Sequence, residues 1–333
     1  MKYRKLGSSG LKVSEISLGG WITFGGTIPE EDARAIVRKA VDGGVNYLDM
    51  ADVYARGEAE RVLGGMLGDY QRDELLLSSK VFWPMGDDPN ERGLSRKHIM
   101  RSVERSLRNL KTDYLDFYYC HREDPETDLE ETMSAMDDLV RSGKILYWGT
   151  SVWSARSLRE AHELADARNL YRPKVEQPQY SLVERSIEKD VLPTAHRTGM
   201  GVVVWSPLGG GLLTGKYNKG IPEGSRATKT KFMEEKLSPE NLRRTREFCK
   251  LADSLGLAPE HLALAWVLAQ PGITSVITGA TRVEHVDSNL KACDVELDDD
   301  VLQRLDELFS IEVPADSDFT EESETAETTG AGS

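Results

Sequence analysis

The chain has 333 residues, a formal net charge of −14 and three cysteines. This length can bury a large core without covalent or metal staples, and three cysteines without any CxxC pair argue against a disulfide framework or a structural zinc site and suit a reducing cytosol. No run approaches the roughly 18 apolar residues of a membrane helix, and residues 1–13 lack the apolar core of a signal peptide, so we expect a cytoplasmic protein without membrane insertion.

The chain begins with an expected β-hairpin, in which residues 2–6 and 11–13 flank a glycine- and serine-rich turn. Short apolar, β-rich runs then alternate with longer amphipathic segments. The expected strands cover residues 14–18, 45–49, 75–80, 114–121, 145–150, 174–177, 202–206 and 274–277. The expected helices cover residues 30–42, 59–67, 95–110, 129–142, 155–168, 187–197, 239–255, 259–269, 283–290 and 300–309.

Eight strands, each followed by helical sequence and without a break in composition, indicate a parallel sheet with crossover helices. Eight is also the number of strands that closes a barrel. We therefore predict an α/β fold, a (β/α)8 TIM barrel preceded by a β-hairpin. An open doubly wound sheet is the structural alternative.

The last 23 residues differ in composition from the rest of the chain. Residues 311–333 contain seven acidic residues and no lysine or arginine, among Ser, Thr, Ala and Gly. Such a segment cannot bury enough apolar surface to offset chain ordering. We predict one barrel domain over residues 1–310 and a disordered acidic tail over residues 311–333. The tail carries half of the net charge, and the remaining acidity disfavours a nucleic-acid partner.

Catalytic groups of a (β/α)8 barrel come from the C-terminal ends of its strands and from the loops that follow. The predicted strands bring to this rim Asp49 with Tyr54, then Lys80, His121, Gln177, and Trp205 with Ser206. Any one of these side chains alone is better explained as a cap, a surface charge or a packing residue. Their arrival at one rim is much harder to explain in that way.

This set of groups fits protonation of an alkoxide as a hydride reaches a carbonyl carbon. A phenol such as Tyr54 has an ordinary pKa of about 10, which makes it a slow proton donor at neutral pH. We expect the Lys80 ammonium to lower that pKa and Asp49 to balance the buried lysine. The imidazole of His121 can donate to the substrate oxygen and orient it.

Three segments resemble the aldo-keto reductase family. The run DMADVYARGEAERVLG, from Asp49 to Gly64, resembles the signature around its catalytic Asp and Tyr, LSSK ending at Lys80 resembles the strand that carries its Lys, and YLDFYYCH ending at His121 resembles the strand that carries its His. The resemblance runs from Tyr3 to about Leu290. It implies a catalytic tetrad of Asp49, Tyr54, Lys80 and His121, with Tyr54 as proton donor in the NADPH-dependent reduction of aldehyde or ketone carbonyls to alcohols.

Within that family the chain resembles the branch that contains the β subunits of voltage-gated potassium channels. WITFGG from Trp21, YWGTS ending at Ser151 and WSPL from Trp205 carry this similarity. The branch often has Asn where this chain has His121, and the difference favours a working reductase. The alternative is an NADP(H)-binding regulatory or redox-sensing subunit.

The chain has no GxGxxG after a strand, so Rossmann-type dinucleotide binding has no support. The resemblance instead implies an extended NADPH or NADP⁺ across the barrel mouth, with the nicotinamide against Trp205. Arg282 and Arg226 would meet the 2′-phosphate, because a guanidinium suits phosphate. The implied cofactor-binding residues are Gly20, Trp21, Asp49, Ser151, Gln177, Trp205, Ser206, Leu208, Gly210, Lys216, Arg226, Gly279, Thr281, Arg282, His285 and Asn289.

Other chemistries fit less well. The run GGLLTGK from Gly210 nearly matches a P-loop, but Tyr217 stands where Ser or Thr would bind Mg²⁺. No tyrosine has a lysine four residues later, as the short-chain dehydrogenase mechanism requires. A sugar isomerase or aldolase lacks paired carboxylates at the strand ends, and we expect no metal. We expect a small-molecule carbonyl substrate and allow for a homo-oligomer, with Trp153 and residues 82–93 and 220–233 around the substrate.

Overall fold

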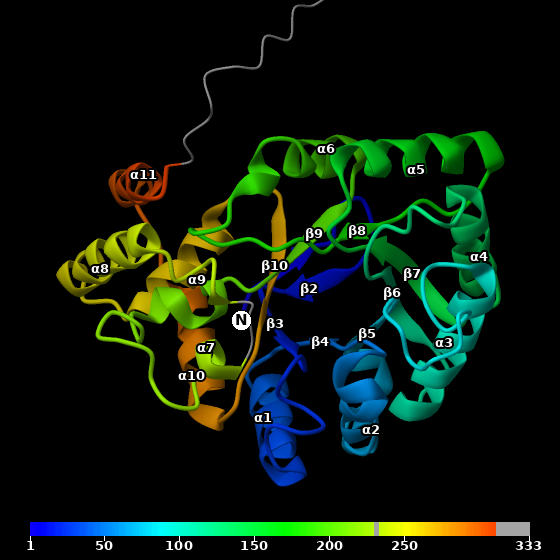
Figure 1. Ribbon diagram of the computed structural model, residues 1–333, viewed down its shortest axis with the longest axis horizontal. Helices are drawn as coiled ribbons and strands as arrows, with labels where there is room; N and C mark the ends of the chain where they lie inside the picture. Colours follow the sequence, from blue (N-terminus) through cyan, green and yellow to red (C-terminus); the bar gives the residue numbers. More distant parts are fainter. Residues whose placement is uncertain (230–232, 311–333) are drawn as a thin grey trace, which may run out of the picture.

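The computed structural model describes residues 1–229 and 233–310, in which eight parallel strands form a closed barrel (Figure 1). The strands are β3 (Ile16–Gly19), β4 (Tyr47–Asp49), β5 (Leu76–Val81), β6 (Leu115–Cys120), β7 (Ile145–Thr150), β8 (Val175–Glu176), β9 (Gly201–Trp205) and β10 (Ile273–Thr278). Each pairs with the next, and β10 pairs with β3 to complete the ring. The predicted TIM barrel is confirmed, and the open sheet is excluded because the barrel has no edge strand.

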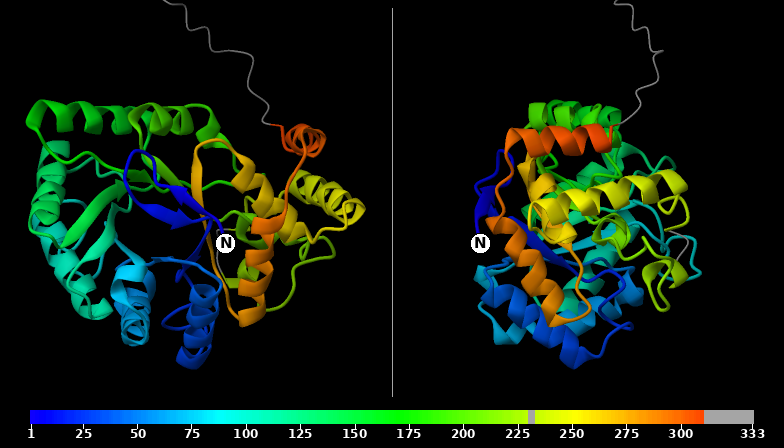
Figure 2. Two further views of the ribbon diagram at one scale, coloured as in Figure 1. Left: turned by 180° about the vertical axis from the view of Figure 1, so that it is seen from behind. Right: turned by 90° about the vertical axis from the view of Figure 1, so that its left-hand side faces the viewer.

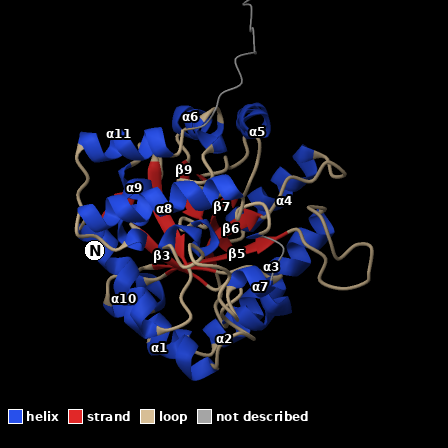
Figure 3. Cartoon of the chain, turned by 60° about the vertical axis from the view of Figure 1, so that its left-hand side comes forward, coloured by secondary structure: helices blue, strands red, loops and turns tan. Residues whose placement is uncertain are grey.

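Helices surround this barrel on its outside (Figure 3). They are α1 (Glu30–Asp42), α2 (Glu58–Gly64), α3 (Arg96–Leu110), α4 (Leu129–Arg141), α5 (Ala155–Arg168), α6 (Val191–Thr198), α7 (Arg226–Lys229), α8 (Pro239–Ser254), α9 (Pro259–Ala269), α10 (Val283–Lys291) and α11 (Asp299–Leu308). Most begin and end within three residues of the predicted bounds. None of the helices that the structure describes is long and apolar enough to cross a membrane. The predicted acidic tail, residues 311–333, lies outside the described residues and stays a prediction.

Local sequence explains where these helices begin. Ser95, Ser154 and Ser238 each accept a hydrogen bond from the backbone N–H three residues later, which satisfies a donor that the first helical turn leaves free. Helix α6 begins four residues later than predicted, because Ser186–Glu188 forms a separate 3₁₀ turn before it.

The predicted N-terminal hairpin is confirmed as β1 (Tyr3–Lys5) paired antiparallel with β2 (Lys12–Ser14). Leu6 and Val13 are fully buried, and they pack with the apolar side chains that fill the barrel, such as Phe117 and Val203. Gly7 has a φ of +48°, which an L side chain rarely adopts, so glycine is required at this turn. The hairpin lies across one end of the barrel, as the rear view shows (Figure 2).

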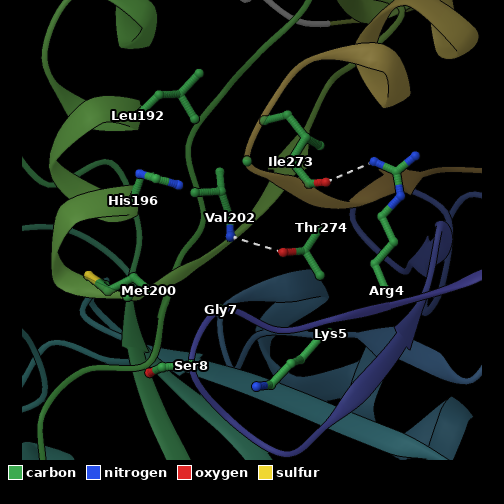
Figure 4. Close-up of a pocket in the computed structure, with 12 residues that line it drawn as sticks. Arg4, Lys5, Gly7, Ser8, Leu192, His196, Met200, Val202, Ile273 and Thr274 are labelled. Carbon is green, nitrogen blue, oxygen red and sulfur yellow. Dashed lines mark hydrogen bonds between the residues drawn. The ribbon is translucent and has the colours of Figure 1, made fainter.

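A cavity of about 430 Å³ lies between this hairpin and the first residues of β9 and β10 (Figure 4). Its wall is held by hydrogen bonds from Arg4 Nη1 to the carbonyl of Ile273 (2.9 Å) and from the Val202 N–H to Thr274 Oγ1 (3.4 Å). None of the predicted catalytic residues lines it. Because the N-terminal end of such a barrel serves stability, catalytic groups are expected at the opposite end.

Candidate active site

Asp49, Lys80 and Tyr54 form a connected group at the C-terminal end of the barrel. Lys80 Nζ donates to Asp49 Oδ2 (2.6 Å), to the Met50 carbonyl (2.7 Å) and to Tyr54 Oη (3.2 Å). The lysine side chain is completely buried. Its three donors are therefore all used, and the phenol of Tyr54 is one of their acceptors.

Asp49 is fixed by more than its ion pair. Its Oδ1 accepts hydrogen bonds from Gln177 Nε2 (2.9 Å), Ser78 Oγ (2.8 Å) and Tyr47 Oη (3.2 Å). Four donor groups thus surround a buried carboxylate, which compensates for its loss of water. The ion pair has no freedom to swing toward solvent.

A layer of polar side chains beneath the site was missed by the sequence interpretation. Tyr47 Oη lies 3.0 Å from Tyr119 Oη and 3.1 Å from Ser78 Oγ. Tyr47, Ser78 and Tyr119 each stand two residues before a predicted catalytic residue. Because side chains on a strand alternate between its two faces, that spacing was the signal that could have identified them.

The pKa of Tyr54 is shifted in the opposite direction from the one expected. Burial, and then the negative charge of Asp49, raise this pKa well above its ordinary value. The expectation that Lys80 would lower it is therefore wrong for this state of the protein, because Asp49 already balances the lysine charge. Burial also lowers the pKa of Lys80, although Asp49 opposes that change. At neutral pH the phenol carries its proton.

His121 follows β6 and faces the same group. Its ring centroid lies 6.1 Å from that of Tyr54, at an interplanar angle of 73°. Burial, together with the charges of Lys80 and Arg122, lowers the pKa of His121 well below its ordinary value, so the imidazole is neutral. Its buried Nδ1 has no hydrogen-bond partner among the described residues. The four predicted catalytic residues are thus brought together, with a neutral imidazole beside a protonated phenol.

Backbone strain also gathers at this end of the barrel. Ile22, Ala55, Arg56, Val152 and Ser206 have φ between +47° and +68°, and each lies in a loop that follows a barrel strand. Left-handed backbone is uncommon for residues other than glycine, and it is a clear outlier for β-branched ones such as Ile22 and Val152. Strained residues of this kind concentrate at functional sites.

Two tryptophans meet at the barrel mouth, one from the loop after β3 and one from the end of β9. The rings of Trp21 and Trp205 lie 6.4 Å apart in an edge-to-face arrangement, and the Arg226 guanidinium lies 5.3 Å above the Trp21 ring. Beside them, a Cβ on Gly20 would come within 2.6 Å of Met50 Sδ, so a larger residue here would require the Met50 side chain to move. The structure thus brings three of the predicted cofactor-binding side chains together.

Ser151 and Gln177 lie side by side after β7 and β8. Ser151 Oγ donates to the backbone carbonyl of Gln177 (2.8 Å), and Gln177 Nε2 donates to Asp49. This chain of contacts links two of the predicted cofactor-binding residues directly to the predicted tetrad. Both side chains are buried, so their orientation is fixed.

The remaining predicted cofactor residues follow β9 and β10. Ser206 and Leu208 lead into a 3₁₀ segment, Gly209–Thr214, in which Gly210 has left-handed backbone. Burial, Arg282 and Lys216 lower the pKa of His285 in that order, so these basic groups lie near one another. Thr281 Oγ1 forms a hydrogen bond with His285 Nδ1 at the start of α10, and Asn289 is buried farther along that helix. A Cβ on Gly279 would meet no atom within 4 Å.

A second cavity, of about 720 Å³, adjoins the site on the side of β7, β8 and β9. Trp153, named above as a possible pocket residue, lines it together with Arg122, Glu123, Gln179 and Trp205. Among the residues that the structure describes, no cluster of three His, Cys, Asp or Glu side chains could hold a metal ion. This end of the molecule therefore offers phenol, imidazole, ammonium and guanidinium groups beside an open volume.

Comparison with known proteins gives a consistent result. Residues 15–309 match the sequence model of the aldo/keto reductase family. A probable voltage-gated potassium channel subunit beta of Arabidopsis thaliana is 43% identical over 302 residues, which cover 89% of this chain and 92% of the relative. A protein of the same name from Oryza sativa subsp. japonica is 42% identical over the same shares of both chains. A putative subunit of that kind from Schizosaccharomyces pombe is 41% identical, with 92% and 93% covered.

Proposed function

Because the chain belongs to the aldo/keto reductase family, we propose that it is an NADPH-dependent oxidoreductase that reduces aldehyde or ketone carbonyls to alcohols. The observation that carries the proposal is the contact of Lys80 Nζ with both Asp49 and the Tyr54 phenol. A buried lysine can be balanced by one carboxylate without help. The additional phenol, held in its protonated state beside a neutral imidazole, is what carbonyl reduction requires.

In this mechanism Tyr54 donates its Oη proton to the substrate oxygen as negative charge develops there. Lys80 Nζ lies 3.2 Å from Tyr54 Oη and stabilises the phenolate that remains. The neutral imidazole of His121 donates an N–H to the same substrate oxygen and fixes its position. Asp49 and the groups bonded to it keep Lys80 in place, so no reorganisation is needed when charge appears.

The residues at the barrel mouth fit a dinucleotide. Lys216, Arg282 and His285 supply basic groups for phosphate, and the loop before them has left-handed backbone at the buried Gly210. Trp205 offers a flat aromatic surface beside Ser151 and Gln177. When bound, NADPH supplies the hydride that adds to the carbonyl carbon. The proton, the positioning of the substrate oxygen and the stabilisation of the phenolate come from side chains of this protein.

The names of the three relatives raise a second candidate, a cofactor-binding channel subunit that senses redox state. His121 favours the reductase, because the imidazole gives the site a second donor to the carbonyl oxygen. The two candidates are separated by a panel of aldehydes and ketones followed by loss of NADPH absorbance, with an identical NADH panel. Turnover of several carbonyls with NADPH supports the reductase, whereas tight NADPH binding without turnover supports the subunit. The cytoplasmic location and a possible homo-oligomer stay predictions.

A further inference from the structure

Arg122 directly follows His121 and lies between the catalytic group and the larger cavity. Its Nη1 donates to the backbone carbonyl of His121, and its guanidinium carbon lies 5.6 Å from the centre of the Trp83 ring. The side chain is half-buried and lines the cavity of about 720 Å³. It is therefore held close to the reacting groups and is still accessible from the space beside them.

The positive charge of Arg122 lacks a close carboxylate. Within the described part of the chain, no Asp or Glu oxygen lies within 4.0 Å of a guanidinium nitrogen of Arg122, so the residue forms no ion pair there. The neighbouring carboxylate of Glu123 accepts a hydrogen bond from the Ser154 N–H instead. Glu176, whose charge does reach Arg122, is fully buried against Thr150 and Trp153. Arg122 therefore has a carbonyl and an aromatic ring as neighbours but no carboxylate to balance its charge, and a half-buried guanidinium of this kind beside a cavity can take an anion from it.

The other basic groups near the carbonyl position are already neutralised. Lys80 is balanced by Asp49 at 2.6 Å, and His121 carries no charge at neutral pH. The charge of Arg122 is felt by Tyr54, Lys80 and His121 alike, which places it near all three. It can therefore attract a charged group on the same molecule whose carbonyl reaches Tyr54.

We propose that Arg122 binds a carboxylate on the substrate, so that the preferred substrates are aldehyde acids or oxo acids rather than neutral carbonyls. This assignment rests on the proposed reductase function. A guanidinium can bind a carboxylate through two parallel hydrogen bonds, which gives both affinity and orientation. Glu184 and Asp190 also line the cavity, but Asp190 is exposed and Glu184 partly so, and water screens such charges.

The test compares 4-carboxybenzaldehyde with 4-nitrobenzaldehyde, which has nearly the same shape but no net charge. The ratio of their kcat/KM values cancels any general effect of a variant on catalysis. Arg122→Gln is expected to lower this ratio by roughly 10- to 100-fold, mainly through the KM of the acid, since a charged hydrogen bond is lost. Arg122→Lys should restore part of the ratio, and Arg156→Gln, an exposed arginine on α5, should leave it unchanged. An unchanged ratio in Arg122→Gln would overturn the proposal.

A binding experiment separates this inference from the proposed function. The product analogue 4-carboxybenzyl alcohol is titrated calorimetrically into protein saturated with NADP⁺, with benzyl alcohol as the neutral reference. If the wild-type chain reduces neither aldehyde, the proposed function fails, and this titration alone decides the inference. Weaker binding of the acid to Arg122→Gln, with no change for benzyl alcohol, supports the carboxylate site. Equal affinities of both proteins for the acid refute it.

Discussion

Tyr54 and Lys80 show how a side chain's role depends on the group that already balances its charge. Lys80 is buried with Asp49 as its counter-ion, so its charge does not lower the pKa of the phenol in this state. The phenol stays protonated at neutral pH and is poised to give that proton away. In the proposed reaction, stabilisation by Lys80 becomes important only when the phenolate forms, which is the differential binding that catalysis requires.

Replacement of Tyr54 by Phe is expected to remove nearly all turnover while NADPH affinity and thermal stability are kept. Loss of the hydroxyl leaves Lys80 with its bonds to Asp49 and Met50, so the buried charge remains paired. General acid catalysis contributes about 10²- to 10⁴-fold, and the rate should fall by a comparable factor. Steady-state kinetics and fluorescence titration of NADPH measure the two effects, with Tyr171→Phe on the surface as a control. Retention of more than about a tenth of the turnover is incompatible with Tyr54 as the acid.

We expect cofactor choice to depend on a second single residue, Arg282. Arg282 precedes α10, its side chain is 68% exposed, and among the residues that the structure describes it forms one ion pair, with Glu284 at 3.9 Å. Arg282→Ala is expected to weaken NADPH binding by about 10-fold and NADH binding much less, because only NADPH carries the 2′-phosphate. Fluorescence titrations with both cofactors measure this, and Arg304→Ala on α11 is the control. Equal losses for the two cofactors would show that Arg282 does not contact the 2′-phosphate.

At the scale of elements, the loop that carries Tyr54 is positioned by the close approach of α2 and α3. Tyr54–Gly57 forms a 3₁₀ segment with left-handed Ala55 and Arg56, and α2 follows at once. The last residue of α2, Gly64, packs directly on the backbone of α3 near Asn109 and Leu110. The strained loop therefore depends on a helix contact about ten residues away.

Gly64→Ala is expected to destabilise the protein and to lower kcat together. The new Cβ would lie 2.8 Å from the Leu110 Cα and closer still to the Asn109 carbonyl, and neither backbone atom can move alone. Such overpacking costs roughly 1–3 kcal/mol, and relief of it would shift α2 and the Tyr54 loop. Gly68→Ala is the matched control, because a Cβ there meets nothing within 4 Å. Chemical denaturation and kinetics of both variants test this, and equal stability of the two would contradict the packing argument.

At the scale of the whole molecule, the barrel separates stability from chemistry. The hairpin and apolar side chains fill one end, and strained loops and polar groups gather at the other. Between the strands and helices the fold also buries ionisable groups at a cost. Burial raises the pKa of Glu176 to about 7, although Thr150 Oγ1 and the Trp153 N–H donate to its carboxyl.

This burial makes the free energy of unfolding depend on pH. A carboxyl whose pKa is raised on folding stabilises the protein fully below its unfolded pKa of about 4.3, and that contribution is lost as pH rises toward 7. Glu176→Gln should therefore match the wild type near pH 5 and exceed it at pH 8, by at most about 3 kcal/mol. Denaturation curves between pH 5 and 8 measure the difference, with the exposed Glu160→Gln as a flat control. A difference that does not change with pH would show that Glu176 remains ionised throughout.

The sequence by itself determined the barrel, the order of its elements and the four residues that meet at its rim. Apolar periodicity, helix caps and turn residues act over a few neighbouring positions, so they can be read along the chain. The C-terminal ends of parallel strands must share one edge, which places Asp49, Lys80 and His121 together once the strands are recognised.

Only the tertiary structure decided how those residues are charged and what surrounds them. The support of Asp49 by Tyr47 and Ser78, the raised pKa of Tyr54 and the unpaired charge of Arg122 all involve groups from different strands and loops. Burial and distance set these properties, and both are fixed by residues far apart in the chain. Local pattern carries no information about either, because it does not specify which side chains displace water from a given group.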